Sequence, residues 1–378
     1  MSSSEKWFQS LISSAGIAIN GTQPHDIHVN NPAMFELVRH QGTLGLGDAY
    51  TRGWWDCPRL DDFFRRVLST EIPHRAGLFI PQLYGILKAR LTNLQSTARA
   101  FEVGRRHYDL DNDLFQAMLG PSMAYSCCYR GDGADTLDDA QFAKYDLICS
   151  KLHLLSNSTL LEIGCGWGGF ARFAAEHYNV RVIGLTVSEQ QANFARKHCA
   201  GLPVEILLQD YRSFNTPVDA IASIGMFEHV GLKNYPTFFD TARRCLLPDG
   251  LFLLRTTGTP QTTLATDPWI NTYIFPNGKI PSLRQLTTAL EGRFLVDELQ
   301  DFGPDSDCTL MAWWKNFNTY LQTSPLAQKI DDHFQRTWQY YLLSCAAAFR
   351  ARTLQLWQLV LSPNSISNSL STGYQTVH

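Results

Sequence analysis

A glycine-rich turn is the first place where this chain could bind a cofactor. Residues 160–170 read LLEIGCGWGGF, an apolar strand that runs into a turn and then into a helix. Glycines in such a turn let the backbone approach a ligand closely, and the first N–H groups of the helix then point at that ligand. The pattern indicates a nucleotide-type cofactor at residues 162–169.

The glycine pattern of this turn is compatible with two kinds of cofactor. Gly164, Gly166 and Gly169 fit the GxGxxG fingerprint of nicotinamide dehydrogenases. That fingerprint requires an acid about 20 residues further on, which binds the ribose hydroxyls. The corresponding position holds Gly-Leu-Thr at 184–186, and no carboxylate follows before residue 189. Because an acid, Glu162, stands inside the strand end instead, the turn favours S-adenosylmethionine.

Polar residues follow the next two expected strands. Thr186 and Gln191 could contact the cofactor, or Ser188 and Gln191 could form a capping box at the start of a helix. Asp210 and Tyr211 could bracket an adenine ring or belong to an ordinary polar loop. Since ligands of such sheets bind at the carboxyl ends of the strands, these segments are expected to meet the glycine turn.

The elements that must position these residues alternate between strand and helix. Such a rhythm is typical of an α/β fold, a doubly wound parallel sheet with helices on both faces. Long helical segments are expected to close the chain, at about 325–349 and on to 361. The expected strands are 159–163, 180–185, 204–208, 220–224 and 250–256.

The chain divides into three expected parts. Residues 1–70 form a small N-terminal α+β domain with two short strands, a hairpin turn at Asn20-Gly21, a glycine-punctuated loop at 42–47 and a helix near 60–68. This domain could be purely structural or could face lipid. Residues 71–106 form a basic helical linker, which could meet an anionic surface or be a solvated connector. Residues 107–378 form the catalytic domain.

Composition excludes several classes of function. A net charge of -3 gives no case for nucleic acid binding. The first residues lack the order of a secretory signal, and no run of about 18 apolar residues suggests a membrane span. The nine cysteines have no CxxC spacing, which argues against a disulfide framework and against a metal site. The sequence therefore predicts a reduced, cytoplasmic protein.

Taken together, the motifs resemble the cyclopropane-fatty-acyl-phospholipid synthase family over nearly the whole chain. The likeness includes the opening domain, which the related mycolic acid cyclopropane synthases lack. The segments that carry it are AING at 18–21, LGLG at 44–47, GWW at 53–55, HYDLDNDLF at 107–115, YSC at 125–127, the turn at 162–169, GLTVSEQQ at 184–191, IGMFEHVG at 224–231, DPWIN at 267–271, YIFPNG at 273–278 and AFRAR at 348–352.

The resemblance implies an S-adenosylmethionine-dependent enzyme with a Rossmann-like class I methyltransferase domain. It further implies a homodimer that is peripherally associated with the inner face of the cytoplasmic membrane and cyclopropanates unsaturated acyl chains of phospholipids. The cofactor contacts that it implies are Tyr125, Ser126, Glu162, Gly164, Gly166, Trp167, Gly168, Thr186, Gln191, Asp210 and Tyr211.

The resemblance also implies a bound bicarbonate as base, and here the chain departs from the family. Cys127 and Glu228 carry over from the cage that holds bicarbonate. The family's histidine is replaced by Arg255, its isoleucine by Thr257 and its tyrosine by Ser306. Arg255 and Thr257, two residues apart on a strand, share one face, which keeps the geometry but changes the chemistry.

Three interpretations follow from these departures. Arg255 could hold bicarbonate by a charge-assisted contact, so that ring closure survives. Alternatively the base is lost, which leaves a lipid C-methyltransferase without ring closure. The third is a catalytically impaired paralogue that binds lipid or a partner, with Arg255 and Glu228 as a plain ion pair. Cys345 resembles a cysteine considered catalytic in the family, although its helical spacing favours a core position.

Overall fold

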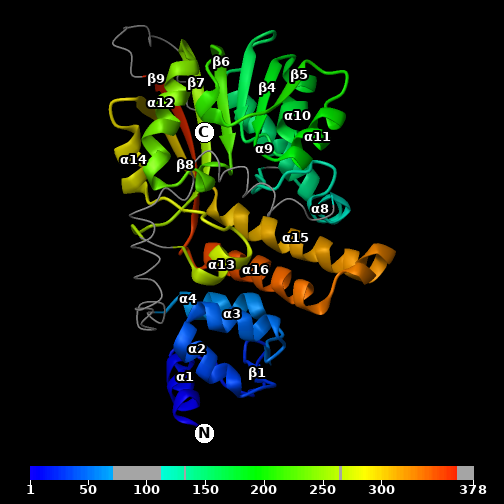
Figure 1. Cartoon of the computed structure of the whole chain (residues 1–378), viewed down its shortest axis with the longest axis vertical. Coiled ribbons are helices and arrows are strands. Elements are labelled where there is room, and N and C mark those ends of the chain that lie inside the picture. The colour runs from blue at the N-terminus through cyan, green and yellow to red at the C-terminus, as the bar shows by residue number, and fades with distance from the viewer. Residues whose placement is uncertain (71–111, 132, 264–265, 364–378) are drawn as a thin grey trace.

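The computed structural model describes residues 1–70, 112–131, 133–263 and 266–363. The predicted basic linker at 71–106 lies outside the described residues. The N-terminal unit contains helices α1 (Ser3–Ser13), α2 (Ala33–Gln41), α3 (Thr43–Thr51) and α4 (Leu60–Leu68). Two short strands, β1 (His28–Val29) and β2 (Trp55–Asp56), pair antiparallel beside them. Figure 1 shows this unit in blue at one end of the molecule.

Two expectations for the N-terminal unit were wrong. Segments 17–21 and 26–29 do not form a hairpin, because their one bridge, Ile19 to Ile27, is parallel. The carboxylate of Asp26 accepts hydrogen bonds from the backbone of Ala18 and Gln23 and closes the turn instead. The expected glycine loop is largely helix α3. A Cβ at Gly47 would overlap the indole of Trp269, so this glycine permits a close helix contact.

The centre of the molecule is a seven-stranded sheet in the order β5-β4-β3-β6-β7-β9-β8. The first five strands of that order run parallel, and β9 lies antiparallel to both of its neighbours. The doubly wound α/β prediction is therefore confirmed. The strands are β3 (Thr159–Ile163), β4 (Arg181–Thr186), β5 (Val204–Leu208), β6 (Val218–Ile224), β7 (Leu246–Gly258), β8 (Phe294–Asp301) and β9 (Gln355–Pro363).

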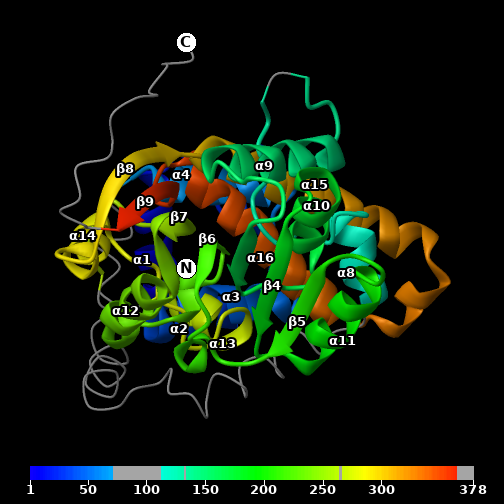
Figure 2. The same cartoon turned by 90° about the horizontal axis from the view of Figure 1, so that it is seen from above.

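Helices cover both faces of the sheet because successive strand side chains point to opposite sides. Leu160 belongs to a core with helices α9 (Leu137–Lys151) and α10 (Gly169–Tyr178). Its neighbour Leu161 belongs to a second core with helices α12 (Tyr235–Cys245) and α14 (Leu283–Leu290). Helix α11 (Glu189–His198) packs on β5. Figure 2 shows α9 and α12 on opposite sides of the sheet.

The helical segments predicted at about 325–349 and on to 361 are longer than the helix that the structure has there. Helix α16 (Asp332–Arg350) ends at a short turn, and the residues after it form strand β9. Residues 356–361 of β9 are all buried, between β7 and β8. Residues 356–361 are apolar except for Gln358. A short run of this kind fits a buried strand and a buried helix equally well, so periodicity alone could not separate them.

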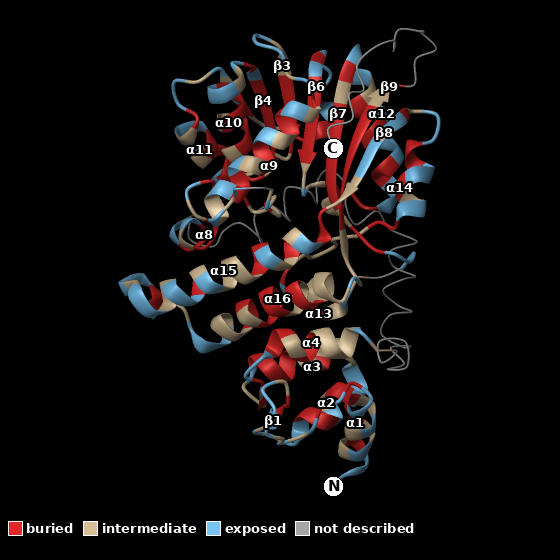
Figure 3. Ribbon diagram, turned by 180° about the vertical axis from the view of Figure 1, so that it is seen from behind, coloured by how far each residue is buried: buried red, intermediate tan, exposed pale blue. Residues whose placement is uncertain are grey.

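Two helices join the sheet to the N-terminal unit. Helix α15 (Gly303–Thr323) packs along α16, and α16 contacts both α3 and α4. One hydrophobic core contains residues of α1–α4 together with α8 (Asn112–Leu119), α13 (Pro268–Tyr273), α15 and α16. Arg350 on α16 adds ion pairs to Asp61 on α4 and to Asp307 on α15, each at 2.8 Å. Figure 3 shows the buried residues continuing across this layer.

Gly47→Ala is expected to destabilise the protein by about 1–3 kcal/mol, because the new Cβ overpacks against Trp269. Without that overlap, alanine within a helix would stabilise by about 0.5–1 kcal/mol, so the sign of the change is diagnostic. Urea unfolding measures it. Trp269→Leu is itself destabilising, but Gly47→Ala should cost less in that background than in the parent. A Gly47→Ala protein at least as stable as the parent would contradict the close contact.

Candidate active site: two cavities that meet

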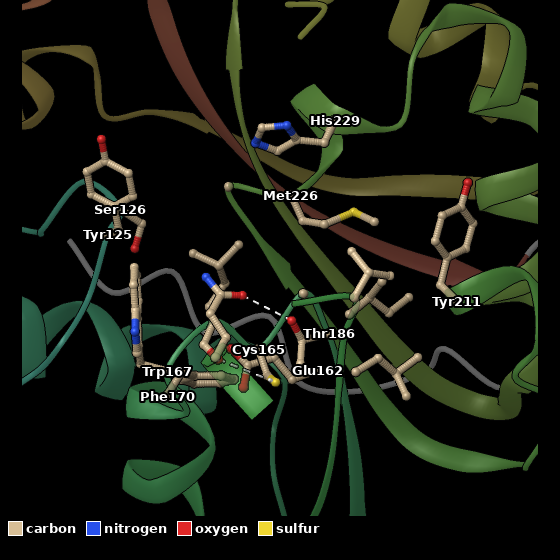
Figure 4. Close-up of a pocket in the computed structure, with 18 of the residues that line it drawn as sticks. Tyr125, Ser126, Glu162, Cys165, Trp167, Phe170, Thr186, Tyr211, Met226 and His229 are labelled. Carbon is tan, nitrogen blue, oxygen red and sulfur yellow. Dashed lines mark hydrogen bonds between the residues drawn. The ribbon is translucent and has the colours of Figure 1, made fainter. Parts of the chain in front are cut away.

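A cavity of about 190 Å³ lies at the carboxyl ends of β3, β4 and β6. Every residue predicted to contact the cofactor lines it except Gly168, which has a left-handed backbone (φ 84°) and precedes helix α10. Figure 4 shows Ser126, Glu162, Trp167 and Thr186 around this space. The structure thus brings together segments that lie up to 86 positions apart, from Tyr125 to Tyr211.

The glycine turn is shaped by neighbours that leave no room for side chains. Gly164 has φ +86°, and a Cβ there would lie 2.6 Å from the Met226 side chain. Gly169, at the start of α10, passes so close to the Ser122 carbonyl that a Cβ would overlap it. Backbone without side chains therefore forms part of the cavity wall at this turn.

Of the two alternatives for residues 186–191, the capping box is partly correct, and both Thr186 and Gln191 line the cavity. Ser188 caps α11 by accepting a hydrogen bond from the Gln191 backbone N–H at 3.3 Å. The Gln191 side chain does not reach back to Ser188, as a capping box would require; its Oε1 accepts from the Thr186 hydroxyl at 3.0 Å. Thr186 and Gln191 thus fix each other at the cavity wall.

Asp210 and Tyr211, at the end of β5, are held by two residues that the sequence did not predict for this site, Arg212 and Phe238. The side chain of Arg212 donates to both carboxylate oxygens of Asp210, at 2.8 and 2.6 Å. Tyr211 lines the cavity, and its ring lies edge-on to Phe238 in the core. An arginine two residues after the acid was the only available signal.

Glu162 is enclosed at the bottom of this cavity. It is 3% exposed, and its Oε2 has no hydrogen-bond partner. Burial penalises the ionised form and raises the pKa of Glu162 to about 8, although the positive charge of Lys144 acts against that shift. An unpaired carboxyl oxygen in the wall of such a cavity is available to a bound ligand.

A second cavity, of about 650 Å³ and mostly apolar, adjoins the first. Tyr125, Ser126, Ile224, Gly225 and His229 line both cavities, so the two meet there. Helices α1–α4 of the N-terminal unit supply one part of its wall, and α15 and α16 supply another. All five residues predicted to be catalytic line this cavity: Cys127, Glu228, Arg255, Ser306 and Cys345.

Glu228 lies just beyond β6, in a short 3₁₀ helix (Phe227–His229). Its Oε1 accepts a hydrogen bond of 2.6 Å from the Thr257 backbone, while its buried Oε2 has no partner. Burial raises the pKa of this carboxyl, and the bond from Thr257 opposes the shift. Since Thr257 acts through its backbone, the loss of the family's isoleucine leaves this contact intact.

Arg255 on β7 is 1% exposed and is fixed from three sides. It donates to the Cys128 carbonyl at 3.1 Å and to Gln358 at 3.2 Å, and its guanidinium lies 4.5 Å from the centre of the Phe302 ring. Its Nε has no partner. No ion pair joins Arg255 to Glu228, both of which the structure describes. The plain ion pair considered from the sequence is therefore absent.

The other three predicted catalytic residues are held differently. The Ser306 hydroxyl donates to the Phe302 carbonyl of its own helix at 3.4 Å. The Cys127 thiol lies 3.1 Å from the Cys128 carbonyl. Burial raises the pKa of Cys345 to about 12, so this thiol stays protonated at neutral pH. A protonated thiol favours a wall position over a nucleophile for Cys345, while Ser306 bonds within its own helix.

Comparison with known proteins gives consistent matches. The family model for mycolic acid cyclopropane synthetase matches residues 95–359. The Escherichia coli K12 cyclopropane-fatty-acyl-phospholipid synthase is 49% identical over 97% of this chain and 96% of its own. Cyclopropane mycolic acid synthase 1 of Mycobacterium tuberculosis is 37% identical over 65% of this chain and 91% of its own. The solved structure of a Mycobacterium tuberculosis cyclopropane synthase has a TM-score of 0.64, with 34% identity over 69% of this chain and 97% of that one.

Glu162→Gln is expected to alter how the stability of the cofactor-free protein depends on pH. The folded carboxyl has a pKa of about 8, against an ordinary 4.5. Between those values the folded state binds more protons than the unfolded state, so the free energy of unfolding falls as pH rises through this window. Glutamine does not titrate, so the variant should lose less stability from about pH 5 to about pH 8.

Urea unfolding at several pH values measures this difference. Glu205→Gln, at an exposed position on β5, is the matched control and should follow the parent protein. Parallel pH curves for Glu162→Gln and the parent would contradict a protonated buried carboxyl.

Proposed function

Because this chain belongs to the mycolic acid cyclopropane synthetase family, we propose that it transfers a one-carbon unit from S-adenosylmethionine to the cis double bond of a phospholipid acyl chain and closes a cyclopropane ring. One observation carries this proposal above the others. A cofactor cavity and a large apolar cavity meet, and Glu228 and Arg255 line the apolar side beside that junction.

The apolar cavity is suited to hold the substrate in a dry, oriented state. An alkene is a weak nucleophile, so it reacts only when it is held against the methyl group without competing water. S-adenosylmethionine supplies that electrophilic methyl group. As its C–S bond breaks, the alkene forms a C–C bond and acquires positive charge, which the carboxylate of Glu228 stabilises. Loss of one proton from the new methyl group then lets the ring close.

The proton acceptor is the finer part of the proposal. Glu228 keeps an unpaired acceptor oxygen and Arg255 an unpaired Nε–H donor, and both residues line the apolar cavity. Bicarbonate has a hydroxyl that can donate to a carboxylate and anionic oxygens that accept from a guanidinium. These two residues would hold it, and it would supply the base that removes the proton.

A second candidate is methyl transfer without ring closure. The observation that favours it is Ser306, whose hydroxyl bonds within its own helix and cannot reach as far as the tyrosine of the family. If Arg255 does not compensate, the cation would lose a different proton and give a methylated or methylene product.

Membrane association and self-association complete the proposal. The substrate chain must leave a bilayer, so we place the enzyme peripherally on the inner face of the cytoplasmic membrane. No helix among the described residues is long and apolar enough to cross a bilayer. Strand β8 lies at the edge of the sheet and exposes Leu295, Val296 and Leu299. An exposed apolar edge strand supports a homodimer formed with a second copy of this chain.

Incubation with S-adenosylmethionine and vesicles of cis-unsaturated phospholipid should yield cyclopropane protons at high field in proton NMR spectra of the acyl chains. Glu228→Gln should lower product formation by roughly 10²–10³-fold, because a group aimed at the developing charge is lost. Glu291→Gln, at an exposed position, should leave the rate unchanged. A one-carbon gain without ring protons would select the methylation alternative, and no gain at all would reject both.

Depleting carbon dioxide and bicarbonate should slow ring formation, and added bicarbonate should restore it. Arg255→Met should lower the rate by roughly tenfold or more and remove the response to bicarbonate, because the charge-assisted contact is lost. Binding of S-adenosylhomocysteine and far-UV circular dichroism control for misfolding of the variant. A parent enzyme indifferent to bicarbonate would contradict this choice of base.

A further inference from the structure

Lys144, on helix α9, is a fully buried cation that the proposed chemistry does not use. Its side chain is 0% exposed, and its amino group donates to the Ser126 hydroxyl at 2.8 Å and to Gln141 Oε1 at 2.6 Å. It forms no ion pair with any carboxylate of the described residues. Burying an amino group without a carboxylate partner is costly, so its position calls for a compensating role.

Lys144 and Gln141 both donate hydrogen bonds to the segment at residues 124–126. The Gln141 amide donates to the Ser126 carbonyl at 2.9 Å and to the Ala124 carbonyl at 3.5 Å. The held segment, residues 124–126, includes Tyr125 and Ser126, which line both cavities. Figure 4 shows Ser126 at that wall, across the cavity from Thr186. Lys144 itself does not line either cavity, so it acts through Ser126.

The hydrogen bond from Lys144 decides what Ser126 can offer to a ligand. A hydroxyl that accepts a bond from an ammonium group retains its own proton for donation. No protein acceptor within the described residues takes that proton, and the hydroxyl borders the cavity. A hydroxyl donor backed by a buried cation is suited to a carboxylate. S-adenosylmethionine has one carboxylate, in its methionine portion.

We propose that Lys144 is a positioning residue, which orients the Ser126 hydroxyl and biases the local field so that this wall binds the carboxylate of the cofactor's methionine portion. Anchoring that end would aim the methyl group at the apolar cavity. The inference depends on the S-adenosylmethionine dependence of the family, not on whether a ring or a methyl branch is formed.

A pH dependence should accompany this role. Burial lowers the pKa of Lys144 to about 7, and the nearby Arg255 lowers it further; Cys127, Cys128 and Glu162 act in the opposite direction. A carboxylate that arrives at Ser126 favours the charged lysine, so binding should be accompanied by proton uptake. As pH rises above about 7, the free protein loses this proton, and the affinity for carboxylate-bearing ligands should fall.

Calorimetry with two ligands tests the proposal. S-adenosylhomocysteine carries the carboxylate, whereas 5′-methylthioadenosine lacks the whole amino-acid portion. Lys144→Met and Lys144→Gln should weaken S-adenosylhomocysteine by roughly tenfold or more, and 5′-methylthioadenosine by less than about twofold. Lys151→Met, on the same helix but paired with Glu298 at the surface, is the matched control. Adding Ser126→Ala to Lys144→Met should cost little more, because both act on one contact.

Equal weakening of both ligands, or unchanged binding of S-adenosylhomocysteine, would overturn the proposal. If both variants fail to fold, the pH dependence of ligand binding by the unsubstituted protein tests the proposal instead. Its affinity for S-adenosylhomocysteine should fall more steeply between about pH 7 and pH 8.5 than its affinity for 5′-methylthioadenosine, and equal slopes would reject the role of Lys144. Failure of ring formation in the vesicle assay would leave these binding results unaffected.

Discussion

The contact between helices α4 and α16 is the constraint on which the apolar cavity depends. Neither the N-terminal unit nor the sheet domain encloses that cavity alone, because its wall includes Phe63 and Phe64 from one and Tyr341 from the other. A continuous hydrophobic core and the ion pair between Asp61 and Arg350 hold the two together. The N-terminal unit is thus part of the wall of the apolar cavity and not an appended module.

The proposed chemistry beside the junction depends on polar atoms that the fold leaves unpaired. Folded proteins satisfy most buried donors and acceptors, so an exception needs an explanation. Glu162, Glu228 and Arg255 each keep one such atom in the wall of a cavity, while their other atoms are fixed by neighbours or by the backbone. The fixed atoms set the orientation, and the unpaired atoms remain available to ligands.

Short motifs allowed the sequence to predict which residues line the smaller cavity. The glycine turn, Thr186 and Asp210 each follow a strand, and parallel strands end at one edge, so their convergence followed from topology. Lys144 could not be found in this way, since its partner Ser126 lies 18 positions away on a segment with no periodic signal. Strand β9 was missed because a buried apolar run has no distinctive period.

Because the apolar cavity lies between the N-terminal unit and the sheet domain, a ligand bound in it would also stabilise the contact between them. An acyl chain bound between the two parts buries apolar surface on both of them. Each Å² of apolar surface buried contributes about 25 cal/mol of favourable free energy. Such a ligand stabilises the assembled state and not the separated one. A bound acyl chain would therefore be both the reactant and a ligand that stabilises the contact between the two parts. Release of the product to the membrane would remove that stabilisation.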